Sequence, residues 1–234
     1  MHTLNDKKNN LELLSHNFKG EGQFLRIKLN SSIQDLNLNL IGKVQLKNVL
    51  MAIIAAKYSG VSLNKILNTI SKLKPVEGRF EKIGKIKNQS KVILDYAHTP
   101  DALKTCLLNL REQFPNKTIT VLFGCGGNRD QNKRSKMGKI ASELSDVVIL
   151  TNDNPRGEVP ENIIRDIREG ISGSYFCELD RAKAIKEAIS TAKNDDVILV
   201  AGKGREMFQE VKLDKIPYQD LDSIRAAMEA RKDV

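Results

Sequence analysis

The stretch KVILDYAHTPDALKTCLLNLREQFPNKTITVLFG, residues 91–124, decides the fold class. It opens with a short apolar run, KVILDYA, and closes on a second one, TITVLFG. Both runs have the length and the residue types of buried strands. The segment between them, DALKTCLLNLREQF, has helical spacing and a candidate N-cap in Asp101. Strand, helix and strand in this order predict an α/β unit.

The same alternation continues along the chain. Helical spacing recurs in SKMGKIASELS, PENIIRDIREGI and RAKAIKEAISTAK, and apolar strand-like runs recur in DVVILT, SYFCEL and DDVILVAG. Strands that are apolar throughout and separated by helices predict an α/β fold with a Rossmann-like, mostly parallel sheet and helices on both faces. Ligands bind such sheets where loops leave the carboxyl ends of the strands. The loops DYAHTPD, FGCGGNRDQNKR, TNDNPRGEV and AGKGREMFQ are therefore the candidate site.

The first ninety residues follow a different pattern. QFLRIKL and IQDLNLNLIG alternate like strands of a hairpin or an edge sheet, and two helical segments follow, with Gly60 ending the first. Two strands and two helices are too few to close a core alone. We therefore expect residues 1–75 to be the C-terminal part of a larger domain, residues 76–90 to be a linker, and residues 91–234 to be a C-terminal domain.

The net charge of +9 lies in the first part of the chain. Residues 1–90 carry 15 Lys and Arg against 6 Asp and Glu, whereas residues 91–234 carry 23 of each sign. The basic residues of the first part are mostly single lysines among apolar positions, with almost no aromatic residues between them, which is typical of a solvated face and not of a base-stacking platform. We therefore expect no nucleic-acid partner.

The composition indicates a cytoplasmic protein without a membrane partner. No apolar run approaches the roughly 18 residues of a membrane span, and the polar start MHTLNDKKNN lacks the apolar segment of a secretory signal. Cys106, Cys125 and Cys177 are odd in number, far apart and without CxxC spacing. They predict neither a disulfide framework nor a zinc site, and reduced thiols suit the cytoplasm.

The loop FGCGGNRD has the glycines of a phosphate cradle but not a known nucleotide motif. A dinucleotide fingerprint that begins at Gly124 fails at Arg129, and no Gly-Lys pair in the chain is followed by Ser or Thr, as a P-loop requires. The loop instead offers permissive backbone followed by an arginine, which can present a bidentate donor to a carboxylate or a phosphate.

Charged groups of both signs follow the neighbouring strands. Arg156 lies in TNDNPRGEVP after Pro155, which stiffens the backbone, and Glu206 lies in AGKGRE after the last predicted strand. The alternative interpretation is that each arginine pairs with a nearby aspartate. If the groups face a ligand, arginines suit its carboxylate and Glu206 suits its ammonium, which together match an amino acid.

The four loops, in this order and spacing, resemble the C-terminal domain of the Mur ligases. Residues 41–83 resemble the end of that family's central, P-loop-type ATP-binding domain. The resemblance implies an ATP-dependent, ADP-forming acid–amino-acid ligase of peptidoglycan precursor synthesis, with Mg²⁺ as a further cofactor. The DNPR form resembles the branch that adds meso-diaminopimelate, and not L-lysine, to UDP-N-acetylmuramoyl-L-alanyl-D-glutamate. These small molecules and ATP are the expected partners.

The resemblance also implies roles for individual residues. The diaminopimelate contacts would be Arg129, Asp153, Asn154, Arg156, Gly202 and Glu206. The contacts around ATP would be Asn48, Arg79, Asp95 and His98. The alternative interpretation is that Asn48 is a helix cap or a surface polar group and that Asp95 is a turn residue at a strand end.

The chain departs from the family pattern in two respects. Arg205 stands in GKGRE where the family has histidine, and the family's UDP-binding domain, phosphate loop and carbamylated lysine have no counterpart. We therefore interpret the chain as a truncated or split ligase, not active alone, with a separately encoded N-terminal half as a potential partner and no assigned catalytic residue or metal ligand. The alternative is a catalytically inactive diaminopimelate-binding module. A dinucleotide oxidoreductase is disfavoured by Arg129.

Overall fold

The computed structural model describes residues 11–29 and 31–231, and the chain divides into two compact units, Met1–Pro75 and Val76–Val234. The polar start MHTLNDKKNN, on which the expectation of no secretory signal rests, lies outside the described residues. Each unit has a hydrophobic core of its own.

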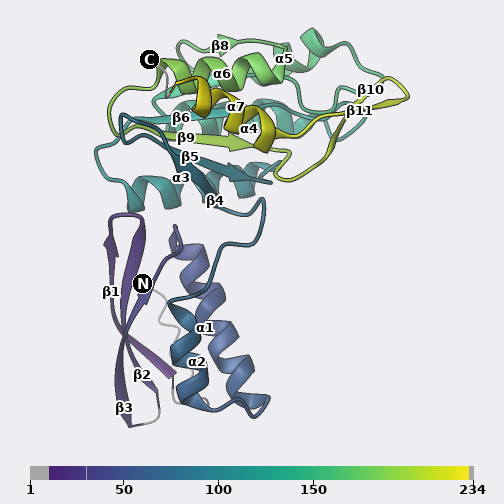
Figure 1. Cartoon of the computed structure of the whole chain (residues 1–234). Coiled ribbons are helices and arrows are strands. Elements are labelled where there is room, and N and C mark those ends of the chain that lie inside the picture. Colours follow the sequence, from purple (N-terminus) through teal and green to yellow (C-terminus); the bar gives the residue numbers. More distant parts are fainter. Residues whose placement is uncertain (1–10, 30, 232–234) are drawn as a thin grey trace. The chain divides into compact units, whose positions relative to one another are not determined.

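The first unit is a three-stranded antiparallel meander with two helices (Figure 1). Its elements in chain order are β1 (Leu11–Lys19), β2 (Gly22–Leu29), β3 (Ser32–Leu38), α1 (Lys43–Tyr58) and α2 (Leu63–Ile70). The predicted hairpin is confirmed as β2 and β3. Strand β1 was not predicted from the sequence, because a register shift between Leu13 and Ser15 interrupts its alternation. Gly60, with φ 82°, follows α1 and confirms the predicted helix end.

One face of this meander is buried. Leu25, Ile27 and Leu29 of β2 are at most 1% exposed and point to the same side, as every second residue of a strand does. They belong to one cluster with Leu46 and Leu50 of α1. The third strand and the helices thus give this unit the core that two strands would not.

The second unit is built on a six-stranded sheet of order β4-β5-β9-β6-β7-β8 (Figure 1). Its strands are β4 (Glu81–Lys85), β5 (Lys91–Asp95), β9 (Val197–Ala201), β6 (Ile119–Phe123), β7 (Val147–Leu150) and β8 (Phe176–Cys177). Only β4 is antiparallel to its neighbour. The predicted mostly parallel α/β sheet is therefore confirmed.

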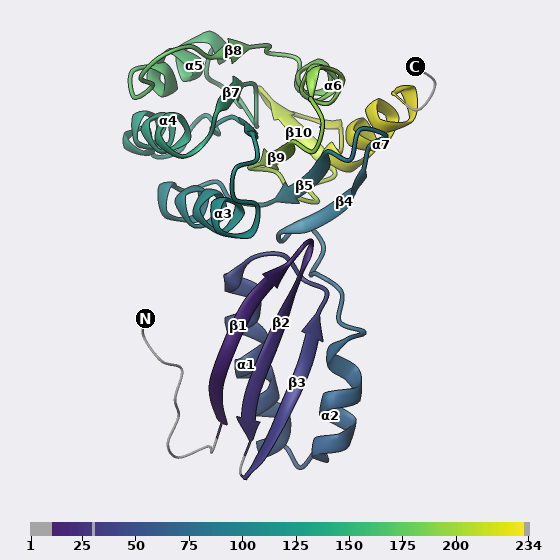
Figure 2. The same cartoon turned by 90° about the vertical axis from the view of Figure 1, so that its left-hand side faces the viewer.

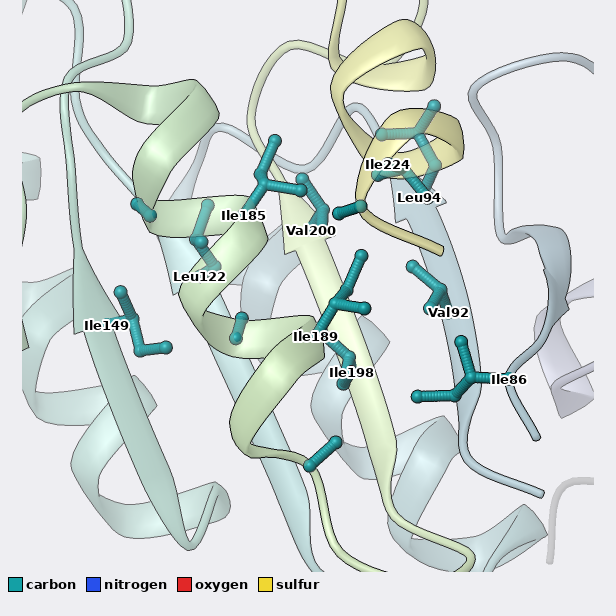
Figure 3. Close-up of a cluster of buried hydrophobic side chains, with 14 residues drawn as sticks. Ile86, Val92, Leu94, Leu122, Ile149, Ile185, Ile189, Ile198, Val200 and Ile224 are labelled. Atoms are coloured by element: carbon teal, nitrogen blue, oxygen red, sulfur yellow. The ribbon is translucent and has the colours of Figure 1, made fainter. Parts of the chain in front are cut away.

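Helices cover both faces of the sheet (Figure 2). One face carries α3 (Pro100–Gln113), α4 (Asn132–Leu144) and α5 (Pro160–Arg168), and the other carries α6 (Arg181–Thr191) and α7 (Asp220–Ala230). Every residue of β5, β6 and β9 is buried, because side chains on both faces of these strands meet a helix layer. Figure 3 shows the second layer, where Ile185 and Ile189 of α6 pack over the central strands and Ile224 of α7 packs near Leu94.

Three local features differ from the sequence interpretation. Residues 76–90, interpreted as a linker, contain β4, which pairs with β5 and belongs to the second unit. The N-cap of α3 is Thr99, whose side chain accepts a hydrogen bond from the backbone of Ala102, and Asp101 lies in the first turn. The hairpin of β10 (Phe208–Val211) and β11 (Asp214–Pro217) and the helix α7 were not predicted.

Candidate functional site

The carboxyl ends of β5, β9, β6 and β7 meet at one edge of the sheet, because these strands are parallel. The loops that leave them begin at Tyr96, Gly202, Gly124 and Thr151. All six predicted diaminopimelate residues lie on three of these loops. The fold therefore brings them to a common edge, as the sequence predicts for an α/β sheet.

The loops after β6 and β7 are bound to each other along their backbones. Gly127 N donates to Asn154 O at 2.9 Å, and Gly127 O accepts from Arg156 Nη1 at 3.0 Å. The spacing between the loops requires glycine: a Cβ on Gly127 would lie 2.0 Å from Pro155 O, and one on Gly124 would lie 2.1 Å from Thr151 O. The glycine-rich loop thus serves close packing against the DNPR loop.

Gly126 separates the two predicted arginines. A Cβ on it would lie 2.8 Å from Arg156 Nη1 and 3.7 Å from Arg129 Cγ, so both side chains flank this residue. Arg129 is exposed, and its Nη1 donates to Asn128 O at 3.1 Å. The two arginines therefore form the cationic side of the candidate site.

Gly126 and Gly127 allow a matched test. Gly127→Ala places a methyl group against backbone and should destabilise the fold by about 2 kcal/mol or more. Gly126→Ala meets only the end of a flexible guanidinium, so it should leave the melting temperature nearly unchanged while displacing Arg156 and weakening binding of an anionic ligand. Thermal melts and ligand titrations of both variants measure this, and equal destabilisation by the two would contradict the described packing.

Arg156 is the most constrained of the predicted residues. Its φ is 50°, and its backbone is tied to the β10–β11 hairpin by Arg156 N to Glu210 O at 2.9 Å and Lys212 N to Arg156 O at 2.6 Å. Its Nε lies 2.5 Å from Glu210 Oε2. The alternative interpretation, an arginine paired with a nearby acid, thus holds for Arg156, although the acid is Glu210 and not an aspartate. A ligand carboxylate would have to share or replace that partner.

Lys203, Asn154 and Glu206 form a connected cluster between the exits of β7 and β9. Lys203 Nζ donates to Asn154 Oδ1 at 2.7 Å and to Glu206 Oε2 at 2.9 Å, and Asn154 Nδ2 donates to the same Glu206 oxygen at 3.0 Å. Tyr96 OH, from the exit of β5, lies 3.4 Å from Glu206 Oε1. Glu206 therefore presents a carboxylate whose orientation is fixed from three strands.

The pKa values of two acidic side chains in this region, Glu206 and Asp153, are shifted in opposite directions. Burial acts to raise the pKa of Glu206, but hydrogen bonds from Lys203, Asn154 and Tyr96 outweigh it and hold the pKa below its ordinary value. Burial also raises the pKa of Asp153, where Arg181 and Lys203 oppose the rise without overcoming it. The lowered pKa favours the anionic form of Glu206, which can hold an ammonium.

Asp153 and Gly202 lie against each other. A Cβ on Gly202, whose φ is 113°, would lie 2.8 Å from Asp153 Oδ2. Asp153 is 8% exposed, so the structure places it behind the more exposed edge of the site. Both remain predicted ligand contacts.

The predicted ATP residues are distributed over both units. Asn48 lies in α1 of the first unit, where its Nδ2 donates to Gln45 Oε1 at 3.4 Å. Asp95 ends β5 and accepts from Phe80 N at 2.7 Å, from Ala97 N at 2.8 Å and from the Cys106 thiol at 3.3 Å. These contacts are those of a strand-end turn residue, and a role for Asp95 at ATP stays a prediction.

Arg79 and His98 both lie around Tyr96. The Arg79 guanidinium lies 4.8 Å from the centre of the Tyr96 ring, and the His98 ring lies 4.6 Å from it, edge to face. Both side chains are exposed. The structure thus brings together these two of the four predicted nucleotide contacts.

Arg205, the departure from the family pattern, forms a bidentate pair with Glu81. Arg205 Nε lies 2.9 Å from Glu81 Oε2, and Arg205 Nη2 lies 2.5 Å from Glu81 Oε1. The same carboxylate accepts from Gly78 N at 2.7 Å, next to Arg79. Arg205 therefore fastens the loop after β9 to the first residue of β4.

Sequence reasoning missed the buried cations that hold the site together. Arg181, 2% exposed, pairs with Asp220 and donates to the carbonyls of Asn152 and Ala201, at the exits of β7 and β9. Lys203 is 0% exposed. Lysine and arginine are rarely buried unless paired. The partner of Arg181 is 39 residues away, and Glu206, close to Lys203 in sequence, does not by itself indicate burial, so only the fold reveals these two cations.

Comparison with known proteins decides the family. The model of the Mur ligase glutamate ligase domain matches residues 78–204, more than half of the chain. The chain belongs to the Mur ligase family. It is 39% identical over 227 residues to the UDP-N-acetylmuramoyl-L-alanyl-D-glutamate–2,6-diaminopimelate ligase of Rickettsia felis, an alignment that covers 96% of this chain and 42% of that protein.

Solved structures agree. A structure of a UDP-N-acetylmuramoyl-L-alanyl-D-glutamate–2,6-diaminopimelate ligase superposes with a TM-score of 0.74 and 32% identity over 95% of this chain and 46% of that one. The MurF ligase from Thermotoga maritima in complex with ADP superposes with a TM-score of 0.66 and 17% identity over 96% and 47%, which shows a shared fold. This Mur ligase chain spans less than half the length of these relatives.

Residues 11–29 and 31–231 were also compared with the features of metal sites, membrane spans and cysteine nucleophiles. No group of three His, Cys, Asp or Glu side chains there could hold a metal ion, and no helix there is long and apolar enough to cross a bilayer. The three cysteines are free. Burial raises the pKa of the Cys125 thiol to about 12, which makes it a poor nucleophile.

Proposed function

We propose that this chain supplies the amino-acid-binding part of an ATP-dependent ligase that adds meso-diaminopimelate to UDP-N-acetylmuramoyl-L-alanyl-D-glutamate in the cytoplasm. The proposal rests on one observation: the fixed carboxylate of Glu206 and the two arginines that flank Gly126 lie at the same edge of the sheet. Relatives named as diaminopimelate-adding ligases support it. The free cysteines are compatible with the cytoplasm.

Each pole of the site has a role in this proposal. Arg156 and Arg129 would bind the far carboxylate of diaminopimelate, and Glu206 would bind an ammonium, with Asn154 between them. Diaminopimelate has a carboxylate and an ammonium at its far end, whereas L-lysine has only the ammonium. L-lysine would leave the arginines without a ligand partner, so the site should discriminate strongly between the two.

The reaction itself requires groups beyond these. In the proposed reaction ATP phosphorylates the terminal carboxylate of the UDP-linked dipeptide, and the amine of diaminopimelate then attacks the acyl phosphate, forming the amide and releasing phosphate. Arg79 and His98 are the exposed side chains that would contact the nucleotide. Among residues 11–29 and 31–231, no group of three His, Cys, Asp or Glu side chains could hold the Mg²⁺ that the family resemblance implies.

The experiment is to add meso-diaminopimelate to the ¹⁵N-labelled chain and to follow its backbone amide signals. We expect shifts at residues 126–129, 153, 154, 156, 157 and 202–206, because these loops contain the proposed contacts. ATP, added separately, should shift residues 79, 96 and 98 instead. Shifts confined to other parts of the chain, or none with millimolar diaminopimelate, would refute the proposal.

A further inference from the structure

Lys203 carries a buried charge at the centre of the site. It is 0% exposed, and its ammonium reaches from the loop after β9 to Asn154 on the loop after β7. A buried ammonium is costly unless it is paired and hydrogen-bonded. Glu206, whose side chain is 26% exposed, is the paired acid and lies between Lys203 and solvent. Any effect of Lys203 on a ligand must therefore pass through these neighbours.

The Asn154 amide has one permitted orientation in this environment. Its Oδ1 accepts from Lys203 Nζ at 2.7 Å and from Glu210 N at 3.0 Å, which uses both lone pairs of the oxygen. Its Nδ2 donates to Glu206 Oε2 at 3.0 Å. Turning the amide round would set its NH₂ group against an ammonium and a backbone N–H. Asn154 is only 4% exposed, and the part of its amide with a hydrogen-bonding group left for a ligand is the donor Nδ2.

We propose that Lys203 is a positioning residue that fixes Asn154 as a donor and Glu206 as an acceptor, so that the carboxylate and the ammonium of an amino-acid ligand bind to different side chains. The identity of the ligand rests on the function proposed above. The arrangement of the three side chains does not, because their hydrogen bonds to one another define it.

The charged and titratable groups around Glu206 determine how strongly Lys203 affects proton binding by Glu206. Lys203 comes from the same loop, Tyr96 from the exit of β5, and Asp153 from the exit of β7, with Arg181 beyond it. Removing the ammonium would leave Glu206 and Asp153 as two neighbouring acidic groups, with Arg181 as the buried cation that acts on Asp153. Glu206 should then bind a proton more readily.

The test follows the side-chain carboxyl ¹³C signal of Glu206 through a pH titration of the ligand-free chain. In the wild type we expect its midpoint below the ordinary glutamate range, and in Lys203→Met we expect it above the wild-type value. Lys139→Met is the matched control, because that lysine side chain is 67% exposed and lies on α4. An unchanged midpoint in Lys203→Met would overturn the proposal.

If Lys203→Met does not fold, a measurement on the wild type tests the positioning role of Lys203. The side-chain NH₂ signals of Asn154 and the ammonium signal of Lys203 should titrate with the same midpoint as Glu206, because the three groups share hydrogen bonds. Flat Asn154 and Lys203 signals through that titration would refute the proposal.

A ligand arm separates this inference from the proposed function. Folded Lys203→Met should bind meso-diaminopimelate at least about tenfold more weakly than the wild type, since a donor and an acceptor lose their fixed positions. Failure of the wild type to bind diaminopimelate would count against the proposed function alone. Undiminished binding by the variant would count against the role of Lys203 alone.

Discussion

Arg181→Ala should lower the free energy of unfolding of the second unit by about 3–5 kcal/mol, because it leaves a buried carboxylate without its partner. Arg181 Nε lies 2.7 Å from Asp220 Oδ1, and Arg181 Nη2 lies 2.8 Å from Asp220 Oδ2. The two side chains are 1% and 0% exposed. Tyr218 OH, 3.1 Å from Asp220 Oδ1, would be the remaining side-chain donor to that carboxylate.

The same substitution should loosen the candidate site. Arg181 Nη1 donates to Asn152 O at 3.2 Å, and Nη2 donates to Ala201 O at 2.9 Å, so one guanidinium joins the exits of β7 and β9. Without it, hydrogen exchange should accelerate in the loops that carry Asn154 and Lys203 before the rest of the unit is affected.

Urea denaturation followed by circular dichroism measures the stability change. The matched control is Arg26→Ala, which removes another bidentate Arg–Asp pair, with Asp35, from an exposed position in the first unit. That control should leave the unfolding of the second unit unchanged. A loss below about 1 kcal/mol in Arg181→Ala, typical of surface pairs, would contradict the buried arrangement.

The sequence predicts those strands whose residues are apolar throughout, because such runs suit only a buried position in the sheet. The runs KVILD and VILVA are continuous and apolar, which suits a strand covered on both faces, and they are β5 and β9. Strands β4 and β10 carry no such signal. EKIGK and FQEV are short and only partly buried, and their pairing depends on neighbours that are distant in sequence.

The site divides in the same way. Because the strands are parallel, the loops that carry Arg156, Asn154 and Glu206 lie at one edge, and that could be predicted from the alternation of elements. The partners of these residues could not. Glu210 becomes the acid beside Arg156 only because the β10–β11 hairpin folds back onto the DNPR loop. Lys203 in a glycine-rich loop has the sequence signature of an exposed lysine, and the fold buries it.

Arg156→Ala should weaken the binding of meso-diaminopimelate by about 2–4 kcal/mol, because the far carboxylate of the ligand would be desolvated without a charge-assisted partner. Arg156→Lys should restore only part of the loss, since an ammonium cannot reproduce the planar fork. Binding of L-lysine should change much less, because lysine has no carboxylate at its far end. Isothermal titration calorimetry of each variant with both ligands measures these effects.

Glu210→Gln is the matched control for this substitution. It removes the charge that pairs with Arg156 in the ligand-free chain while it keeps the shape of the side chain and the backbone ties of the hairpin. Arg156 would then be freer to bind a ligand, so diaminopimelate affinity should be equal or higher. If Arg156→Ala lowers the affinities for both ligands equally, or lowers neither, Arg156 serves only the packing of the loops.

The central claim is that cationic and anionic side chains of the site bind the carboxylate and the ammonium at the far end of an amino acid. The most direct test is the ratio of the affinities of the unaltered chain for diaminopimelate and for L-lysine. Calorimetric titration with meso-diaminopimelate and, separately, with L-lysine gives that ratio. The structure predicts that diaminopimelate binds at least about a hundredfold more tightly, since lysine would leave the arginines without a ligand partner. Equal affinities for the two ligands would contradict it.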